Sequence, residues 1–333
     1  MEFSCKGQGA DFCFLAAVED FLGSPENMKF SGHESFPLRY AWLPKAVRSI
    51  SNDSKALSDE EDAMVELGLG KNMVRSLRFW VQATGIAELG ADGFKVTDFG
   101  QAILLDSQGD PYLEDVRTLW LLHWKLSTHL KEPLFAWDYM MNRWQEPEIW
   151  RSRVIKAFQS EAVAIGRQLS RATIEQHFDV FIHTYVPTRG RKADLQEDNL
   201  DCPLVQTGLI EQVGERIPEN SIKSEATYSF RREEKPEISA RLFCYCLNDF
   251  WESRHANEKT VSFKDVAIGH GSPGQIFKLP EADIRERLDS IAEDSEGVFD
   301  FEESTVLQTV FRPDRPNQAK MLRAVYEEQT API

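Results

Sequence analysis

The sequence has 333 residues but no apolar run of the roughly 18–20 residues that a membrane-spanning helix needs. Its apolar stretch at 12–18 is short and is flanked by Asp11, Glu19 and Asp20. It also lacks the basic leader and small-residue cleavage site of a secretory signal. We therefore expect a cytoplasmic protein with no membrane partner. Hydrophobic residues make up 42% of the chain and charged residues 28%, which is typical of a globular protein.

Cysteine is scarce. The five cysteines are odd in number and widely spread, which argues against a disulfide framework and for a reducing compartment. Cys244 and Cys246 form a C-x-C pair, but no second pair stands at the spacing of a zinc site. We expect no structural zinc.

Three catalytic motifs are also missing. The sequence has no phosphate loop of the form GxxxxGK[S/T], no HExxH zinc motif and no GxSxG nucleophile turn. The Gly-Leu-Gly-Lys segment at 68–71 is too short to surround a nucleotide phosphate. These absences argue against ATP hydrolysis by this chain.

Positive charge is in deficit. Lys and Arg number 38 against 54 Asp and Glu, and the net charge of −16 opposes non-specific contact with a nucleic-acid backbone. A net charge is an average, however, and a local basic face can still bind a polyanion. The carboxylate excess indicates solubility and leaves room for a magnesium site.

The most readable pattern lies between residues 29 and 110. Ser58 and Glu61 have the spacing of a helix-opening capping box, and a Gly-Leu-Gly turn follows. The predicted elements are a helix from Ser58 to about residue 67, a helix at 71–83, strands at 86–89 and 94–96, and a helix from about Thr97. This is the order of a winged helix-turn-helix, whose second helix enters the major groove of DNA.

The second of these helices has a basic outer face and contains no acidic residue. Lys71, Arg75 and Arg78 recur on it at helical spacing, which fits contact with DNA phosphates. The alternatives are a solvated face or a protein-docking surface. A second basic contact is predicted in a later loop, at Arg189, Arg191 and Lys192.

The whole chain predicts a mainly α, α+β fold with winged helix-turn-helix-like modules around a helical middle. Ser35 is expected to cap an early helix that Pro44 kinks. The aromatic residues of the middle are better explained by core packing than by base stacking. The predicted parts are an N-terminal extension (1–28), a winged-helix-like DNA-binding domain (29–110), a helical middle domain (111–186) and a C-terminal α+β domain resembling a second winged helix (187–333).

The C-terminal part shows a further series of elements. We expect strands near 205–212 and 227–230, helices at 236–253 and 280–292, a turn at 272–274 and a hairpin at 298–311.

Two groups of residues are candidates for chemistry. His33 and Glu34 could activate water or bind a metal, or they could organise the start of a helix. Glu197, Asp198 and Asp201 offer the carboxylate oxygens that magnesium prefers, unless they are a solvated charge run.

A third polar group is weaker. Glu175, Asp179 and His183 share one face of a predicted helix. Such a face could hold a metal, but a polar helix surface is the commoner explanation, and we adopt it.

Four segments are similar to a bacterial family that was first catalogued as a domain of unknown function and includes SspB of the DNA phosphorothioation system. They are 29–40 (KFSGHESFPLRY), 62–80, 197–204 (EDNLDCPL) and 271–279 (GSPGQIFKL). The resemblance implies a magnesium-dependent DNA nickase, an endonuclease that acts in phosphorothioate modification and anti-phage defence. It implies DNA as a partner, together with a cysteine desulfurase (SspA), an ATPase (SspC) and an ATP pyrophosphatase (SspD), and it leaves a homo-oligomer open. It does not identify the catalytic residues.

Two other functions remain open. The chain could be a non-catalytic DNA-binding adaptor that recruits the sulfur-transfer enzymes, or a winged-helix transcriptional regulator. Cleavage of DNA separates the nickase from both alternatives.

Overall fold

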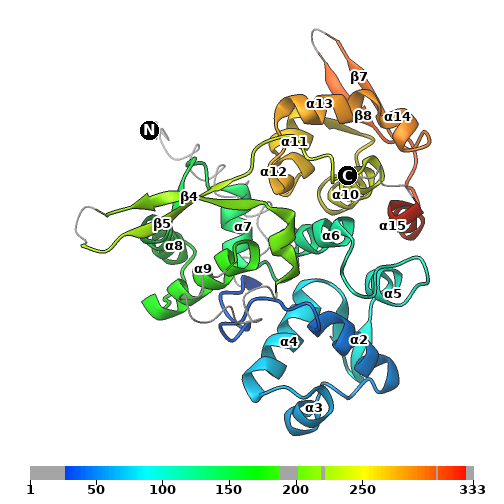
Figure 1. Cartoon of the computed structure of the whole chain (residues 1–333). Coiled ribbons are helices and arrows are strands. Elements are labelled where there is room, and N and C mark those ends of the chain that lie inside the picture. The colour runs from blue at the N-terminus through cyan, green and yellow to red at the C-terminus, as the bar shows by residue number, and fades with distance from the viewer. Residues whose placement is uncertain (1–26, 188–201, 219–221, 305–306, 328–333) are drawn as a thin grey trace, which may run out of the picture.

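The computed structural model describes residues 27–187, 202–218, 222–304 and 307–327. In these ranges the chain is mainly helical, with small antiparallel sheets, so the predicted mainly α, α+β class is confirmed. Helices α2 to α4 lie at one end of the molecule, and α10 to α14 lie at the opposite end (Figure 1).

The N-terminal elements follow the predicted order. They are α2 (Trp42–Asn52), α3 (Glu60–Leu67), α4 (Lys71–Ala83), β1 (Ala87–Gly90), β2 (Gly93–Val96) and α5 (Asp98–Leu104). The N-cap of α3 is Asp59 and not the predicted Ser58. The Asp59 carboxylate accepts hydrogen bonds from the backbone N–H groups of Glu61 and Asp62, at 2.8 and 3.0 Å. Gly68 has a φ of 65° and ends α3, which permits the tight turn into α4.

The predicted helix after Ser35 was placed too early. Glu34 and Ser35 have positive φ angles of 47° and 63°, and α2 begins only at Trp42. Pro44 therefore lies in the first turn of α2, where its missing N–H has no intrahelical acceptor, and it causes no break.

The middle of the chain is helical as predicted, and its aromatic residues form the core. Its elements are α6 (Val116–Ser127), α7 (Phe135–Asn142), β3 (Ile149–Trp150), α8 (Arg151–Ala164) and α9 (Arg171–Tyr185). Trp120, Trp124 and Trp137 are fully buried, so the core-packing interpretation is confirmed for them.

The C-terminal part contributes strands to two sheets. Its elements are η3 (Pro203–Thr207), β4 (Ile210–Arg216), β5 (Glu225–Phe230), α10 (Ala240–Arg254), β6 (Thr260–Ser262), α11 (Phe263–Ile268), α12 (Pro273–Phe277), α13 (Glu281–Asp289), α14 (Ile291–Asp294), β7 (Asp300–Glu303), β8 (Gln308–Phe311) and α15 (Gln318–Glu327). The sheet orders are β3-β5-β4 and β6-β8-β7, so β5 pairs with a strand of the helical middle. The predicted hairpin at 298–311 is confirmed. The predicted turn at 272–274 is wrong, because Ser272 caps α12 and Pro273 begins it.

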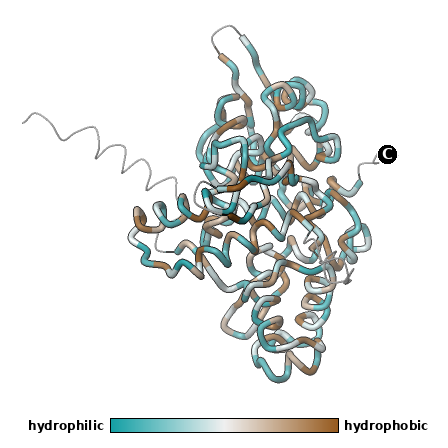
Figure 2. Tube along the Cα trace, turned by 60° about the vertical axis from the view of Figure 1, so that its left-hand side comes forward, coloured by the Kyte–Doolittle hydropathy of each residue, from teal (hydrophilic) through white to brown (hydrophobic). Residues whose placement is uncertain are grey.

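Hydrophobic and hydrophilic stretches alternate at short intervals along the coloured part of the trace (Figure 2). Accordingly, no helix among the described residues has the length and apolar character needed to cross a membrane.

A buried hydrogen-bond network joins three helices at Tyr185. His123 Nε2 donates to the carbonyl of Ile276 at 3.1 Å, so Nδ1 of the neutral ring is an acceptor. The Tyr185 hydroxyl donates to this Nδ1 at 2.7 Å and accepts from Trp137 Nε1 at 2.9 Å. The hydroxyl is thus the partner of the Trp137 N–H and the nearer of two partners of His123 Nδ1, the other being Ser127 Oγ at 3.5 Å.

Replacing Tyr185→Phe should therefore lower the free energy of unfolding by about 1–3 kcal/mol, because it leaves the buried N–H of Trp137 unpaired and removes the shorter hydrogen bond to His123. Urea unfolding followed by circular dichroism measures this change. The control is Tyr112→Phe, since the Tyr112 side chain is 66% exposed. Equal losses in the two variants would show that the Tyr185 hydroxyl adds nothing to stability.

Candidate nucleic-acid interface

The predicted basic face of α4 meets a carboxylate from α3. Arg75 Nε and Nη2 donate to the two carboxylate oxygens of Glu60, at 2.7 and 3.2 Å. Lys71 Nζ lies 3.3 Å from the same carboxylate, and Arg78 Nη1 lies 3.9 Å from it. Three cations therefore form ion pairs with one carboxylate.

The three cations differ in exposure. The Lys71 side chain is 59% exposed, Arg75 is 41% exposed and Arg78 is 19% exposed. Hydrogen bonds with Glu60 raise the pKa of Arg75, whereas burial lowers the pKa of Arg78. Lys71 and Arg75 are thus the groups that a phosphate approaching from solvent meets first.

The segment at 31–36, which contains both candidate catalytic residues, packs against the same helix. Gly32 has a φ of 115°, and a Cβ there would lie 2.8 Å from the Phe79 ring, so only glycine fits without a shift. The indole N–H of Trp80 donates to the carbonyl of Phe36 at 3.0 Å. These contacts place the 31–36 segment beside the basic face of α4.

His33 is buried inside this contact, with its ring edge against Phe79 at 5.6 Å between centroids. His177 Nε2 accepts from the backbone N–H of Ala136 at 3.0 Å, so His177 Nδ1 carries the proton and donates to His33 Nε2 at 2.9 Å. The His33 proton must then sit on Nδ1, which is buried and has no hydrogen-bond partner among the described residues. Burial lowers the pKa of His33 to about 4. A buried, neutral ring whose acceptor nitrogen is occupied favours the organising role over that of a general base.

The surroundings of Glu34 differ from those of His33. It is half-buried, and the Glu34–Ser35 pair adopts two successive left-handed backbone conformations, which cost of order 1–3 kcal/mol for each non-glycine residue. Its negative charge contributes to the raised pKa of Arg75. The fold therefore places Glu34 near enough to act electrostatically on Arg75, a relation that the sequence did not reveal.

The described residues contain no cluster of three or more His, Cys, Asp or Glu side chains that could ligate a metal ion. Arg151 forms ion pairs with both Glu175 and Asp179, so the polar-surface interpretation of that face is confirmed. The other predicted residues, Glu197, Asp198, Asp201, Arg189, Arg191 and Lys192, lie outside the described ranges.

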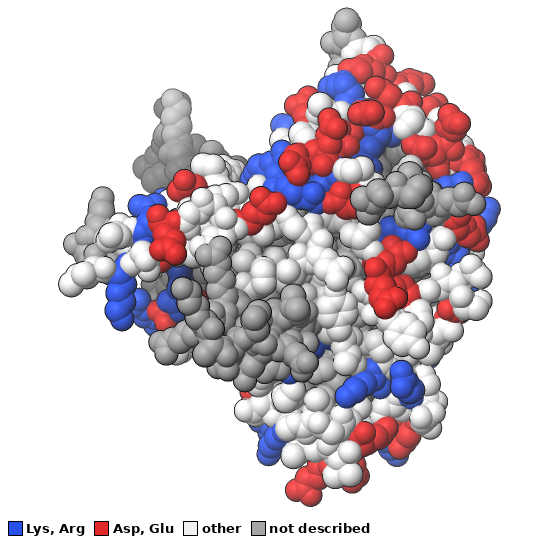
Figure 3. Space-filling model, viewed as in Figure 1, with Lys and Arg blue, Asp and Glu red and all other residues white. Residues whose placement is uncertain are grey.

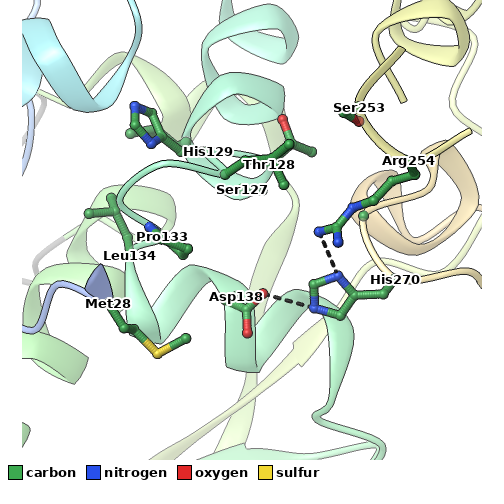
Figure 4. A pocket seen from close by; sticks show the side chains of 13 residues that line it. Met28, Ser127, Thr128, His129, Pro133, Leu134, Asp138, Ser253, Arg254 and His270 are labelled. Carbon is green, nitrogen blue, oxygen red and sulfur yellow. Dashed lines mark hydrogen bonds and ion pairs between the residues drawn. The ribbon is translucent and has the colours of Figure 1, made fainter. Parts of the chain in front are cut away.

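One polar cluster escaped the sequence analysis. His270 Nε2 lies 2.9 Å from Asp138 Oδ1, and Arg254 Nη2 lies 3.1 Å from His270 Nδ1 (Figure 4). They line a cavity of about 20 Å³, which is close to the minimum for one water molecule. His270 directly precedes the 271–279 segment, and Gly271 donates its N–H to Asn142 at 2.7 Å. The cluster thus fastens that segment to α7.

Acidic side chains are concentrated far from α4 along the chain. Residues 281–303 contain ten acidic and two basic residues, and red atoms gather over α13, α14 and the β7–β8 hairpin (Figure 3). The net charge of the whole chain therefore says little about the potential at α4.

The buried histidine pair predicts a pH dependence of stability. The folded-state pKa of His33 lies below its ordinary value, so between pH 6.5 and about 4 the unfolded chain binds a proton that the folded chain does not. The free energy of unfolding should therefore decrease as the pH is lowered from 6.5 to about 4, by up to about 1.4 kcal/mol per pH unit for one proton. His33→Gln keeps an acceptor for His177 but cannot titrate. Urea unfolding at several pH values should give a shallower dependence for this variant, whereas parallel curves would contradict the assignment.

The chain is similar to two solved structures and matches one family model. The chain is 26% identical to the magnesium ion-bound SspB crystal structure, with a TM-score of 0.73, over 90% of this chain and 94% of that one. It is also 26% identical to a second SspB crystal structure, with a TM-score of 0.75, over 91% of this chain and 90% of that one. No curated protein matches the chain. A family model described as "Protein of unknown function (DUF4007)" matches residues 30–326, and the chain belongs to this family.

Proposed function

We propose that this chain is a DNA-nicking subunit of an Ssp-type DNA phosphorothioation system. The proposal is supported by the similarity to SspB structures over about nine-tenths of both chains. The observation that carries it within this molecule is the basic face of α4, with the Glu34 carboxylate beside it. Cations would hold a DNA phosphate there, and a carboxylate would orient the attacking water.

In this proposal residues 29–110 act as a winged helix. Helix α4 is the recognition helix, and the β1–β2 hairpin is the wing that reaches the DNA backbone. A cysteine desulfurase, an ATPase and an ATP pyrophosphatase of the SspA, SspC and SspD types would act on the opened strand.

Magnesium enters as the cofactor of the proposed reaction. One of the similar crystal structures is of a magnesium ion-bound SspB. Because the described residues offer no magnesium site, Glu197, Asp198 and Asp201 remain the predicted ligands.

The combined change Arg75→Ala and Arg78→Ala tests the DNA contact. Each lost phosphate contact should lower the slope of log affinity against log salt by about one, so the double variant should bind duplex DNA more weakly and with less salt dependence. Fluorescence anisotropy of a labelled duplex at four salt concentrations measures both quantities. An unchanged slope would exclude α4 from the interface.

Nicking itself is tested on supercoiled plasmid, with magnesium or with EDTA. We expect open-circular product only with magnesium. Loss of a group that positions or activates water should lower the rate by about 10²-fold or more, so Glu34→Ala or Asp201→Ala should be nearly inactive. Glu293→Ala, at an exposed carboxylate of α14 outside the proposed interface, is the matched control and should nick like the wild type.

The second candidate is a non-catalytic adaptor that binds DNA and recruits the sulfur-transfer enzymes. It is favoured by the burial of His33, which leaves one of the two predicted catalytic side chains without access to solvent. DNA binding without magnesium-dependent nicking would support it, and tight sequence-specific binding alone would favour a transcriptional regulator.

A further inference from the structure

The Glu60 carboxylate occupies the position that a phosphate would take on the basic face of α4. It receives two hydrogen bonds from Arg75 and lies within 4 Å of both Lys71 and Arg78. Two donors of one guanidinium on two oxygens of one anion is the geometry by which arginine also binds phosphate. Glu60 thus has the charge sign and the contacts of a bound oxyanion.

This carboxylate does not satisfy the cations around it. Lys71, Arg75 and Arg78 all form ion pairs with Glu60, while Glu34 and Asp59 act on Arg75 and Arg78 only through their charge. Nε and Nη2 of Arg78 are buried and have no hydrogen-bond partner among the residues that the structure describes. A phosphodiester offers more acceptor oxygens than a carboxylate. Once Arg78 turns toward a bound phosphodiester, its Nε and Nη2 groups can donate hydrogen bonds that Glu60 does not accept.

Glu60 is also not needed to hold its own helix. The N-cap of α3 is Asp59, which accepts the two N–H bonds of the first turn. The Glu60 side chain is 27% exposed and belongs to the first residue of the helix, so it can swing toward solvent without breaking a helical hydrogen bond. An ion pair that is accessible to solvent on both sides contributes little to stability.

We infer that Glu60 is an intramolecular competitor for a nucleic-acid phosphate, and that the phosphate displaces it from Lys71, Arg75 and Arg78 when DNA binds. The inference rests on the proposed DNA-binding function and adds a residue that limits its strength. The free protein holds its cations in place with its own carboxylate. Only a polyanion that supplies several phosphates at once compensates for the loss of the ion pairs with Glu60.

The test measures the affinity of the full-length protein for a labelled DNA duplex by fluorescence anisotropy. Glu60→Gln removes the competing charge and should raise the affinity about three- to tenfold at low salt. It should also steepen the salt slope by about one, because another cation becomes available to phosphate. Glu61→Gln is the matched control. It removes the same charge from the same helical turn, at an exposed residue that forms no ion pair within the described ranges, and it should change affinity much less.

A double-mutant cycle identifies the freed cations. If the gain comes from Arg78, adding Arg78→Ala to Glu60→Gln should abolish most of it. Circular dichroism melting of every variant checks the fold.

Two results would overturn the inference. If the wild type binds DNA and Glu60→Gln binds equally or more weakly, Glu60 positions the cations and does not compete with DNA. Equal gains in Glu60→Gln and Glu61→Gln would mean a general charge effect. If neither the wild type nor Glu60→Gln binds duplex DNA, the proposed DNA-binding function fails together with the inference. Plasmid nicking by the wild type tests the proposed nicking activity separately.

Discussion

The arrangement of the N-terminal half depends on one buried contact, the hydrogen bond between His33 and His177. The two rings are 144 residues apart in sequence, and they stack at 5.2 Å between centroids. Next to them, Lys29 exchanges backbone hydrogen bonds with Pro133 and Phe135, and Phe30 stacks on Phe135. A short segment is therefore fixed on one side to α7 and α9. Its other side holds α4 through Phe79 and Trp80.

This arrangement gives the His33–His177 pair a structural role, although neither side chain is exposed to solvent. Both histidines are buried and neutral, and burial lowers the pKa of each. Their value to the fold is geometric, since each ring presents one donor and one acceptor in fixed directions. The next two residues, Glu34 and Ser35, have left-handed backbone conformations, and the Glu34 charge acts on Arg75.

Local signals were enough to predict the N-terminal elements. The helical repeat of apolar residues, the Gly-Leu-Gly turn and the hairpin glycines are all short-range, so α3, α4 and the β1–β2 hairpin were found close to their observed ends. The early helix was misplaced because Ser35 resembles an N-cap in sequence, while its φ of 63° comes from packing that no local pattern records.

The site was less predictable than the fold, for the same reason. The periodicity of α4 revealed its three cations but not their partner, because Glu60 reaches them from another helix. Likewise, Asp138 and His270 are 132 residues apart, and neither lies in a motif that predicts the other. Pairings of this kind depend on how helices pack, and a single sequence carries no local pattern that records them.

The distribution of charge also limits how DNA can approach. At physiological ionic strength the Debye length is about 8 Å, so exposed charges farther apart than this barely influence each other. Residues 281–303, which include α13, α14 and β7, contribute −8 to the net charge of −16, and their acidic surface therefore does not cancel the cations of α4. It does repel any duplex that comes near it. Helix α3 is also acidic in its first turn, so a polyanion that reaches the cations of α4 must compete with carboxylates there, and Glu60 is the one that forms ion pairs with all three cations.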